Sequence, residues 1–251
     1  MESLSQITSN NMTADESTRP AQGVCECGNA THPHWMLTRW SPRADVCEEC
    51  AAAAESAAEK ANAAAATEGI AHAVASETAR IAPSARSRAM TFDAYEPGSG
   101  SQRAAMDAVS GSGSVWLHGL PGCGKTHLAT AAALKAVSAG EHVERWLVAD
   151  LMAKVRTDAM TSGSDMETTV ARLSTCDLLV LDDLGVERTT PLALETLYRI
   201  VDKRYDYDRR TIVTSNAAPS SVARSVGARV HSRLVGMCRV VRIDGSDWRL
   251  R

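Results

Sequence analysis

Residues 119–129 read GLPGCGKTHLA, and this stretch decides which fold the rest of the chain must build. It satisfies the pattern G-x-x-x-x-G-K-[ST], in which Gly119 and Gly124 are the fixed glycines and Lys125 and Thr126 close the motif. Glycines permit positive φ angles and let backbone N–H groups approach phosphate oxygens without an intervening Cβ. A helix that begins at Lys125 adds the partial positive charge of its N-terminus. The stretch therefore predicts a loop that holds the phosphates of a nucleotide.

The predicted nucleotide site extends over the whole loop. A flexible tether is the other interpretation of so many glycines, and the ordered apolar segments on both sides argue against it. Lys125 is expected to reach the β- and γ-phosphates and Thr126 to hold Mg²⁺. Cys123, beside Lys125 at a helix N-terminus, predicts a reactive thiol whose alkylation blocks nucleotide binding. The residues assigned to ATP are Gly119, Leu120, Pro121, Gly122, Cys123, Gly124, Lys125, Thr126 and His127.

A second acidic motif, CDLLVLDDLG, occupies residues 176–185. Four apolar residues at 178–181 predict a buried strand that delivers Asp182 and Asp183 to the ligand edge of a parallel sheet. Asp182 is expected to hold Mg²⁺ through its waters, and Asp183 to orient or deprotonate the attacking water. A plain strand followed by a capping acid is the alternative, and the neighbouring phosphate loop makes it the weaker one.

A third motif, RRTIVTSN, ends at Asn216. Its β-branched residues at 211–214 predict a strand that brings Asn216 to the same edge. An amide there can hold the lytic water or sense the γ-phosphate, while a simple turn asparagine is the alternative.

Alternating strands and helices fill the chain beyond residue 99. Short apolar runs predict strands at 114–117, 143–148, 178–181, 211–214 and 239–243, and the longest helices are expected at 125–139 and 191–209. This rhythm predicts an α/β fold, a P-loop NTPase core in which a parallel five-stranded sheet lies between helices.

Five stretches together resemble one family. GLPGCGKTHLA, LLVLDDLG, TIVTSN, ARVHSRL and SDWR occur in the order found in AAA+ ATPases of the bacterial helicase-loader type, DnaC and DnaI. The transposition ATPase IstB belongs to the same clade, and the resemblance covers residues 88–251. It implies an AAA+ core without a helical lid that self-associates and binds single-stranded DNA and a replicative helicase. Asp183 departs from the glutamate that many AAA+ enzymes carry, and we expect slow, partner-stimulated hydrolysis.

The resemblance also assigns three arginines. Arg233 stands where these ATPases carry the arginine that reaches the γ-phosphate of a neighbouring subunit, so it is expected to act in catalysis. Arg229 lies one helical turn earlier, on the same face. Arg249 resembles the sensor arginine that contacts phosphate within its own subunit. Each is otherwise a surface cation.

Single-stranded DNA is the ligand expected for the assembled ring. Lys154, Arg156 and a loop at 160–165 lie between the second and third strands, where related ATPases line their central channel. Residues 199–251 carry 12 basic and 5 acidic side chains, which favours contact with phosphates, although a solvated basic face explains the charge equally well.

Four cysteines occur within residues 24–50, in the stretch VCECGNATHPHWMLTRWSPRADVCEEC. Two pairs at this separation predict a tetrahedral Zn²⁺ site, with unpaired thiols or disulfides as alternatives. The C-x-C spacing is tight, so His32 or His34 is an alternative ligand. Loaders of the DnaI type also begin with a zinc-bearing module that binds the helicase. Trp35, Met36 and Trp40 are then expected to supply an exposed docking patch, and the alternative is that they form the core of the module. The expected zinc ligands are Cys25, Cys27, Cys47 and Cys50.

These patterns predict the division of the chain into a disordered arm (1–23), a zinc-binding helicase-docking module (24–50), a helical linker (51–98) and an AAA+ ATPase domain (99–251). No run approaches 18 apolar residues, which excludes a membrane span. A polar start and an odd cysteine count of 7 favour a reducing, cytoplasmic location. The sequence predicts an ATP-dependent helicase loader; the alternatives are an IstB-like transposition ATPase and a non-hydrolysing ATP-dependent switch.

Overall fold

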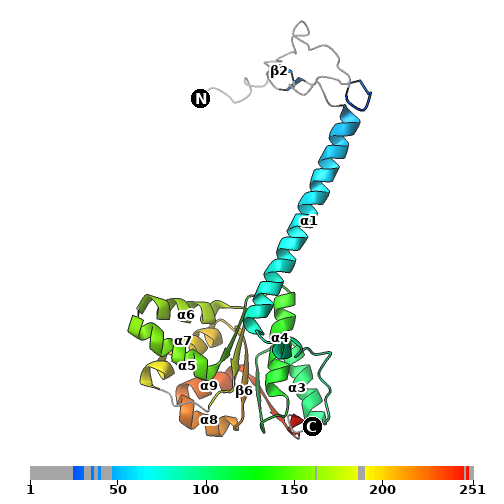
Figure 1. Cartoon of the computed structure of the whole chain (residues 1–251). Helices are drawn as coiled ribbons and strands as arrows, with labels where there is room; N and C mark the ends of the chain where they lie inside the picture. Colours follow the sequence, from blue (N-terminus) through cyan, green and yellow to red (C-terminus); the bar gives the residue numbers. More distant parts are fainter. Residues whose placement is uncertain are drawn as a thin grey trace, which may run out of the picture. The chain divides into compact units, whose positions relative to one another are not determined.

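The computed structural model describes residues 25–30, 35–36, 39–40, 47–161, 163–185, 190–245 and 247–248. The chain forms two compact units, Met1–Ala71 and His72–Arg251. Figure 1 shows the elements of both units along the chain. The arm expected at 1–23, the alternative ligands His32 and His34, and the sensor candidate Arg249 lie outside the described residues.

The second unit is built on a five-stranded sheet with the strand order β4-β5-β6-β3-β7. All four strand pairs are parallel, which confirms the predicted α/β fold. The carboxyl ends of the strands therefore meet at one edge. Strand β5 lies in the sheet interior between β4 and β6, and every one of its residues is buried. The strands are β3 (Val115–Gly119), β4 (Val143–Leu147), β5 (Leu178–Asp182), β6 (Arg210–Ser215) and β7 (Arg239–Ile243).

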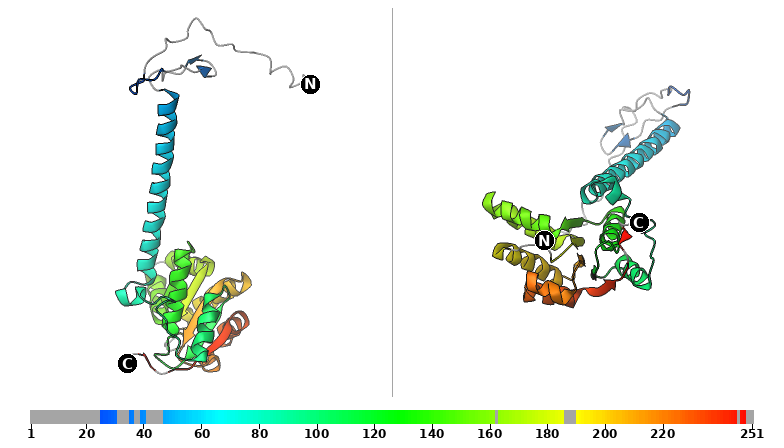
Figure 2. Two further views of the ribbon diagram at one scale, coloured as in Figure 1. Left: turned by 90° about the vertical axis from the view of Figure 1, so that its right-hand side faces the viewer. Right: turned by 60° about the horizontal axis from the view of Figure 1, so that its bottom comes forward.

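Helices cover both faces of this sheet (Figures 1 and 2). Alternate residues of β5 enter different cores, because successive side chains of a strand point to opposite faces. Leu178 and Val180 pack with α3, α4 and the end of α1, whereas Leu179 and Leu181 pack with the later helices. The helices of this unit are α2 (Ala85–Arg88), α3 (Gly100–Ser110), α4 (Lys125–Ser138), α5 (Val148–Thr161), α6 (Gly163–Thr175), α7 (Pro191–Asp206), α8 (Pro219–Val226) and α9 (Ala228–Met237).

The prediction of a loop at residues 160–165 is wrong. Met160 lies in α5 and Asp165 in the first turn of α6. An acidic side chain in a first turn favours a helix start, because it faces the positive end of the helix dipole. The predicted DNA-contacting residues Lys154 and Arg156 therefore lie on a helix.

The first unit contains a short antiparallel pair, β1 (Trp35–Met36) with β2 (Arg39–Trp40), and most of α1 (Glu48–Ile81). The helix predicted for the linker is present because alanine, glutamate and lysine all favour helix. It ends two residues before Pro83, as expected from the proline ring. No helix among the described residues has the length and apolarity needed to cross a membrane.

Candidate nucleotide-binding site

The phosphate loop joins β3 to α4, and two of its glycines are required by close contacts. Gly122 and Gly124 have φ angles of 75° and 102°. A Cβ on Gly124 would lie 2.7 Å from the ring of Tyr95, and a Cβ on Gly122 would lie 1.8 Å from the carboxylate of Asp247. The loop is therefore enclosed by chain segments that precede and follow the core.

Lys125 is the first residue of α4 and is only 6% exposed. Its ammonium donates to the carbonyl oxygens of Gly119 at 2.9 Å and Leu120 at 2.8 Å. Cys123 lies beneath the loop with its thiol 3.7 Å from this ammonium, and its side chain is fully buried in the core. The predicted reactivity of Cys123 is therefore wrong, because alkylating reagents cannot reach a buried thiol in the folded loop.

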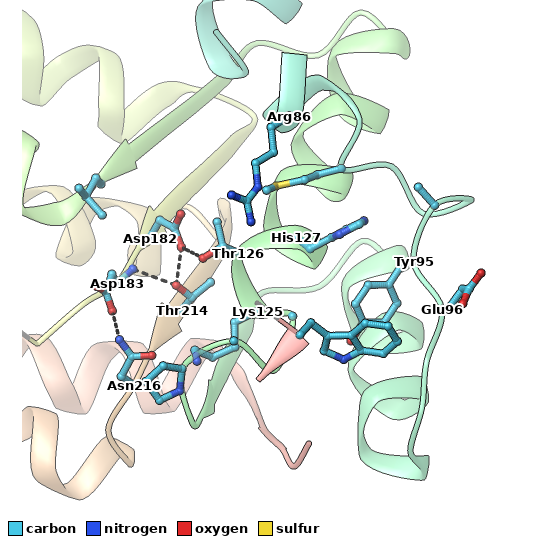
Figure 3. A pocket seen from close by; sticks show the side chains of 17 residues that line it. Arg86, Tyr95, Glu96, Lys125, Thr126, His127, Asp182, Asp183, Thr214 and Asn216 are labelled. Atoms are coloured by element: carbon cyan, nitrogen blue, oxygen red, sulfur yellow. Dashed lines mark hydrogen bonds between the residues drawn. The ribbon is translucent and has the colours of Figure 1, made fainter. Parts of the chain in front are cut away.

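Asp182 ends β5 and collects three donors, although it is only 3% exposed. The hydroxyl of Thr126 donates to Oδ1 at 3.0 Å and that of Thr214 to the same oxygen at 2.7 Å (Figure 3). The guanidinium of Arg145 donates to Oδ2 at 2.9 Å. Thr126 and Asp182, which lie together as expected, offer the hard oxygen ligands that Mg²⁺ prefers, so the donor set fits this ion.

Asp183 and Asn216 are brought together beside this carboxylate. The amide of Asn216 donates to Oδ1 of Asp183 at 2.6 Å, and the backbone N–H of Asp183 donates to the hydroxyl of Thr214 at 2.9 Å. Asp183 has a φ angle of 61°, in the left-handed region. Both side chains line the same cavity as Lys125 (Figure 3), which is the position expected for groups that act on a water molecule.

This cavity has a volume of about 620 Å³, within the range of small-molecule sites. One wall comes from the segment before α3. The phenol of Tyr95 packs edge-on against His127 at 5.1 Å between ring centroids, and His127 Nε2 hydrogen-bonds to the carbonyl of Thr91 at 2.8 Å. Burial raises the pKa of Tyr95 to about 12, so its ring is neutral. Residues of this wall that the sequence did not predict are Arg86, Met90, Tyr95 and Glu96.

Arg145 and Thr214 are two further partners that the motifs missed. Both stand on strands adjacent to β5 in the sheet. The parallel register pairs Val213 with Leu181, which places Thr214 beside Asp182. On the other side it pairs Arg145 with Val180, two residues before Asp182 and on the same face of β5. Strand order, which the sequence alone did not provide, was the information needed to find them.

Arg229 and Arg233 share a face of α9, as their spacing predicts, and both contact α7. The guanidinium of Arg233 donates to Asp202 at 2.7 Å and lies 4.6 Å from the ring centroid of Tyr205. Arg229 lies over Tyr198 at 5.9 Å. The hydrogen bond to Asp202 raises the pKa of Arg233. Neither arginine lines the cavity of its own chain.

The four cysteines of the first unit form a cluster in which all sulfur atoms lie within 4.8 Å of one another. All are free thiols, and the Sγ atoms of Cys27 and Cys47 are 3.5 Å apart. Tetrahedral coordination at a Zn–S distance of about 2.3 Å requires sulfurs separated by about 3.8 Å. Hydrogen bonds from the backbone of Cys27 and Cys47 lower the pKa of Cys25 to about 6, whereas hydrogen bonding to the neighbouring sulfurs raises the pKa of Cys50 to about 12. The cluster fits Zn²⁺.

With this geometry in place, residues 99–251 match the family model described as IstB-like ATP binding protein. The chain belongs to the IstB-like ATP-binding family. Over 130 residues this IstB-like chain is 33% identical to the replicative helicase loader DnaC of Escherichia coli strain K12, which covers 52% of the chain and 50% of that protein. It is 31% identical over 153 residues to the ATP-binding protein of insertion sequence IS21 from Pseudomonas aeruginosa, covering 57% and 55% of the two chains.

A crystal structure of the DnaC helicase loader aligns with the IstB-like chain at a TM-score of 0.56 and 26% identity. The alignment covers 64% of this chain and all of that one. These similarities confirm the resemblance to DnaC-type AAA+ ATPases. The chain spans about half the length of the curated relatives it matches.

Proposed function

We propose that this chain is an ATPase that loads a replicative helicase onto single-stranded DNA. The observation that carries the proposal is the convergence of Lys125, the Thr126–Asp182 pair and the Asp183–Asn216 pair on one cavity in a chain of the DnaC type. The cavity is large enough for a nucleotide, and its polar groups lie at the edge where a parallel sheet binds ligands.

The nucleotide site works through groups that are already close together. The backbone N–H groups of residues 119–126 surround the phosphates, and Lys125 exchanges its two carbonyl partners for phosphate oxygens. Thr126 and Asp182 hold Mg²⁺, which neutralises charge on the phosphates during transfer. Asp183, oriented by Asn216, accepts the proton of the attacking water.

A second subunit completes the site. Arg233 lies on a part-exposed surface outside its own cavity, which suits a cation that serves a neighbouring subunit. Arg229 adds positive charge one turn away on the same face. Arg249 is proposed to contact phosphate within its own chain. Self-association through this domain follows from these roles.

The first unit is proposed to dock the helicase, with Zn²⁺ held by the four-cysteine cluster. The half-buried cations Lys154 and Arg156 on α5 are proposed to contact the backbone of single-stranded DNA. Aromatic residues make up only 4% of the chain, so backbone electrostatics rather than base stacking dominates this binding. The affinity for DNA is expected to fall steeply as salt rises.

Two other functions remain in view. A transposition ATPase that remodels DNA for a transposase is favoured by the match to the IstB-like family and by the IS21 relative. A nucleotide switch would bind ATP without turnover. Retained loading by an Asp183→Asn variant favours the switch, and capture of a transposase rather than a helicase favours the transposition ATPase.

The Lys125→Ala variant of the full chain tests the proposal. Loss of the charge-assisted bonds to phosphate is expected to weaken Mg²⁺·ATP binding about a hundredfold, measured by titration with a fluorescent ATP analogue. The wild-type chain should capture a replicative helicase from its host and increase helicase occupancy on circular single-stranded DNA, and the variant should not.

Lys135→Ala on the same helix is the matched control, because Lys135 lies at the far end of α4. It should behave as the wild type in both assays. Unchanged ATP affinity in Lys125→Ala would show that the nucleotide site is assigned wrongly, and helicase loading without ATP would contradict the proposed ATP-dependent loading.

A further inference from the structure

One arginine joins the magnesium aspartate to the end of a helix that lies outside the matched family domain. Arg145, on the edge strand β4, donates from one guanidinium nitrogen to Asp182 Oδ2 at 2.9 Å. Its other terminal nitrogen donates to the carbonyl oxygen of Ile81 at 3.1 Å. Ile81 is the last residue of α1, where backbone carbonyls have no partner within the helix. A single side chain therefore spans from the nucleotide site to α1.

The negative charge of Asp182 is balanced by the guanidinium of Arg145. Its Oδ1 accepts two hydroxyl groups, so the Arg145 guanidinium is the cation bonded to a carboxylate that is 3% exposed. A buried carboxylate is costly unless a positive charge is paired with it. The Nε of Arg145 is buried without a hydrogen-bond partner, so its two terminal nitrogens make the polar contacts of this guanidinium.

We propose that Arg145 is a positioning residue that couples metal occupancy at Asp182 to the end of α1. The inference rests on the proposed function of the cavity as a Mg²⁺·nucleotide site. Without metal, Arg145 neutralises Asp182 and binds Ile81 at the same time. With Mg²⁺·nucleotide bound, two cations share one buried carboxylate, and the repulsion between them weakens the Arg145–Asp182 bond. The contact with Ile81 then loosens.

A second arginine holds the same helix end without touching Asp182. Arg80 pairs with Glu144 at 3.3 Å and also donates to the carbonyl of Val143, both on β4. Glu144 is 1% exposed and pairs with Arg172 at 3.3 Å as well. Besides the apolar packing of Ile81, the end of α1 thus has a polar contact through Arg145, which reaches Asp182, and another through Arg80, which does not. This second contact supplies a matched control.

Hydrogen–deuterium exchange of the full chain tests the coupling. A non-hydrolysable ATP analogue is bound throughout, and the exchange rate of peptides covering residues 72–82 is compared between samples in EDTA and samples in Mg²⁺. In the wild type, adding Mg²⁺ should increase the exchange rate at these residues on the order of tenfold. The loss of one charge-assisted bond changes the local opening equilibrium of the helix by about that factor. Arg145→Gln should exchange equally in both states.

Metal affinity gives an independent readout. Arg145→Gln removes the competing cation, so Mg²⁺ affinity at saturating nucleotide should rise on the order of tenfold. Its thermal midpoint should fall without ligand and recover with Mg²⁺·nucleotide. Arg145→Lys keeps the charge and loses the forked contact to Ile81, so it should keep wild-type metal affinity and lose the exchange response. Arg80→Gln should raise exchange in every state and keep the Mg²⁺-dependent difference.

Two results would overturn the inference: equal exchange at residues 72–82 with and without Mg²⁺ in the wild type, or wild-type Mg²⁺ affinity in Arg145→Gln. Nucleotide affinity is measured in the same samples. If the analogue does not bind at all, the proposed nucleotide site itself is wrong, and this failure is distinguished from the others by the binding curve alone.

Discussion

Asp183 adopts a backbone conformation that few residues tolerate. Its φ angle of 61° lies in the left-handed region, where aspartate and asparagine are enriched because their short polar side chains bond locally. The Asp183 carboxylate is held here by the distant side chain of Asn216 at 2.6 Å. The strand therefore turns sharply after Asp182, and the conformation gives a local reason for aspartate rather than the longer glutamate at this position.

Asp183→Asn should separate binding from hydrolysis. Asparagine tolerates the same backbone but cannot accept a proton, so single-turnover phosphate release should fall by about 10²–10⁴-fold. The affinity for Mg²⁺·ATP should change by less than about threefold. Asp177→Asn, before the other end of β5, should retain both activities. If Asp183→Asn releases phosphate at the wild-type rate, another residue must accept the proton of the attacking water.

At the scale of elements, Arg204 ties three of them together. It lies on α7 and is fully buried, with hydrogen bonds to the carbonyls of Leu173 and Cys176 at 2.9 Å and to the hydroxyl of Thr211 at 2.9 Å. These partners lie on or beside α6 and β6. Burial lowers the pKa of this guanidinium, and a buried charge must keep its partners to be tolerated.

Arg204→Met should destabilise the second unit strongly. Methionine fills much of the volume but leaves several buried carbonyls unpaired, which should reduce the free energy of unfolding by about 2–4 kcal/mol. Urea denaturation followed by circular dichroism measures the loss. The control is Arg209→Met, an exposed partner of Asp177, which should cost less than about 1 kcal/mol. Equal losses in both variants would contradict the role of Arg204.

The elements also show where sequence reasoning succeeds. Apolar-rich runs located all five strands of the sheet. The buried strand β5 is apolar up to Asp182, as expected for a parallel strand covered on both faces, whereas β4 and β7 also carry charged side chains. The glycine-rich loop and the paired aspartates were found because each motif lies within one short segment. Arg145 and Thr214 were missed, since their roles depend on strand order. The helices around residues 160–165 were missed because a loop was expected there between the second and third strands, by resemblance to related ATPases.

At the scale of the whole molecule, the cysteine cluster and the ATP site lie in different compact units. The cluster belongs to a short segment whose sequence has few bulky apolar residues, and bound Zn²⁺ would stabilise such a segment. The ATP site stands on a large sheet with its own core. The two are therefore expected to lose structure separately.

Zinc removal should test this separation. The purified chain should carry about one Zn²⁺, measured by mass spectrometry, because four thiolates complete its coordination. Cys47→Ser should lose the metal and make residues 25–50 sensitive to protease, while ATP affinity stays unchanged. Cys238→Ser, a buried thiol of the second unit, should keep its zinc. Loss of ATP binding together with zinc would show that the units depend on each other.

The ion pair between Arg233 and Asp202 affects how readily neighbouring subunits of the proposed assembly would separate. If this guanidinium moves to a phosphate on a neighbouring subunit, it must first leave Asp202. The loss of that ion pair offsets part of the free energy gained from the phosphate contact. If the proposed self-association forms rings closed by this contact, they would therefore open more readily than the phosphate contact alone would allow.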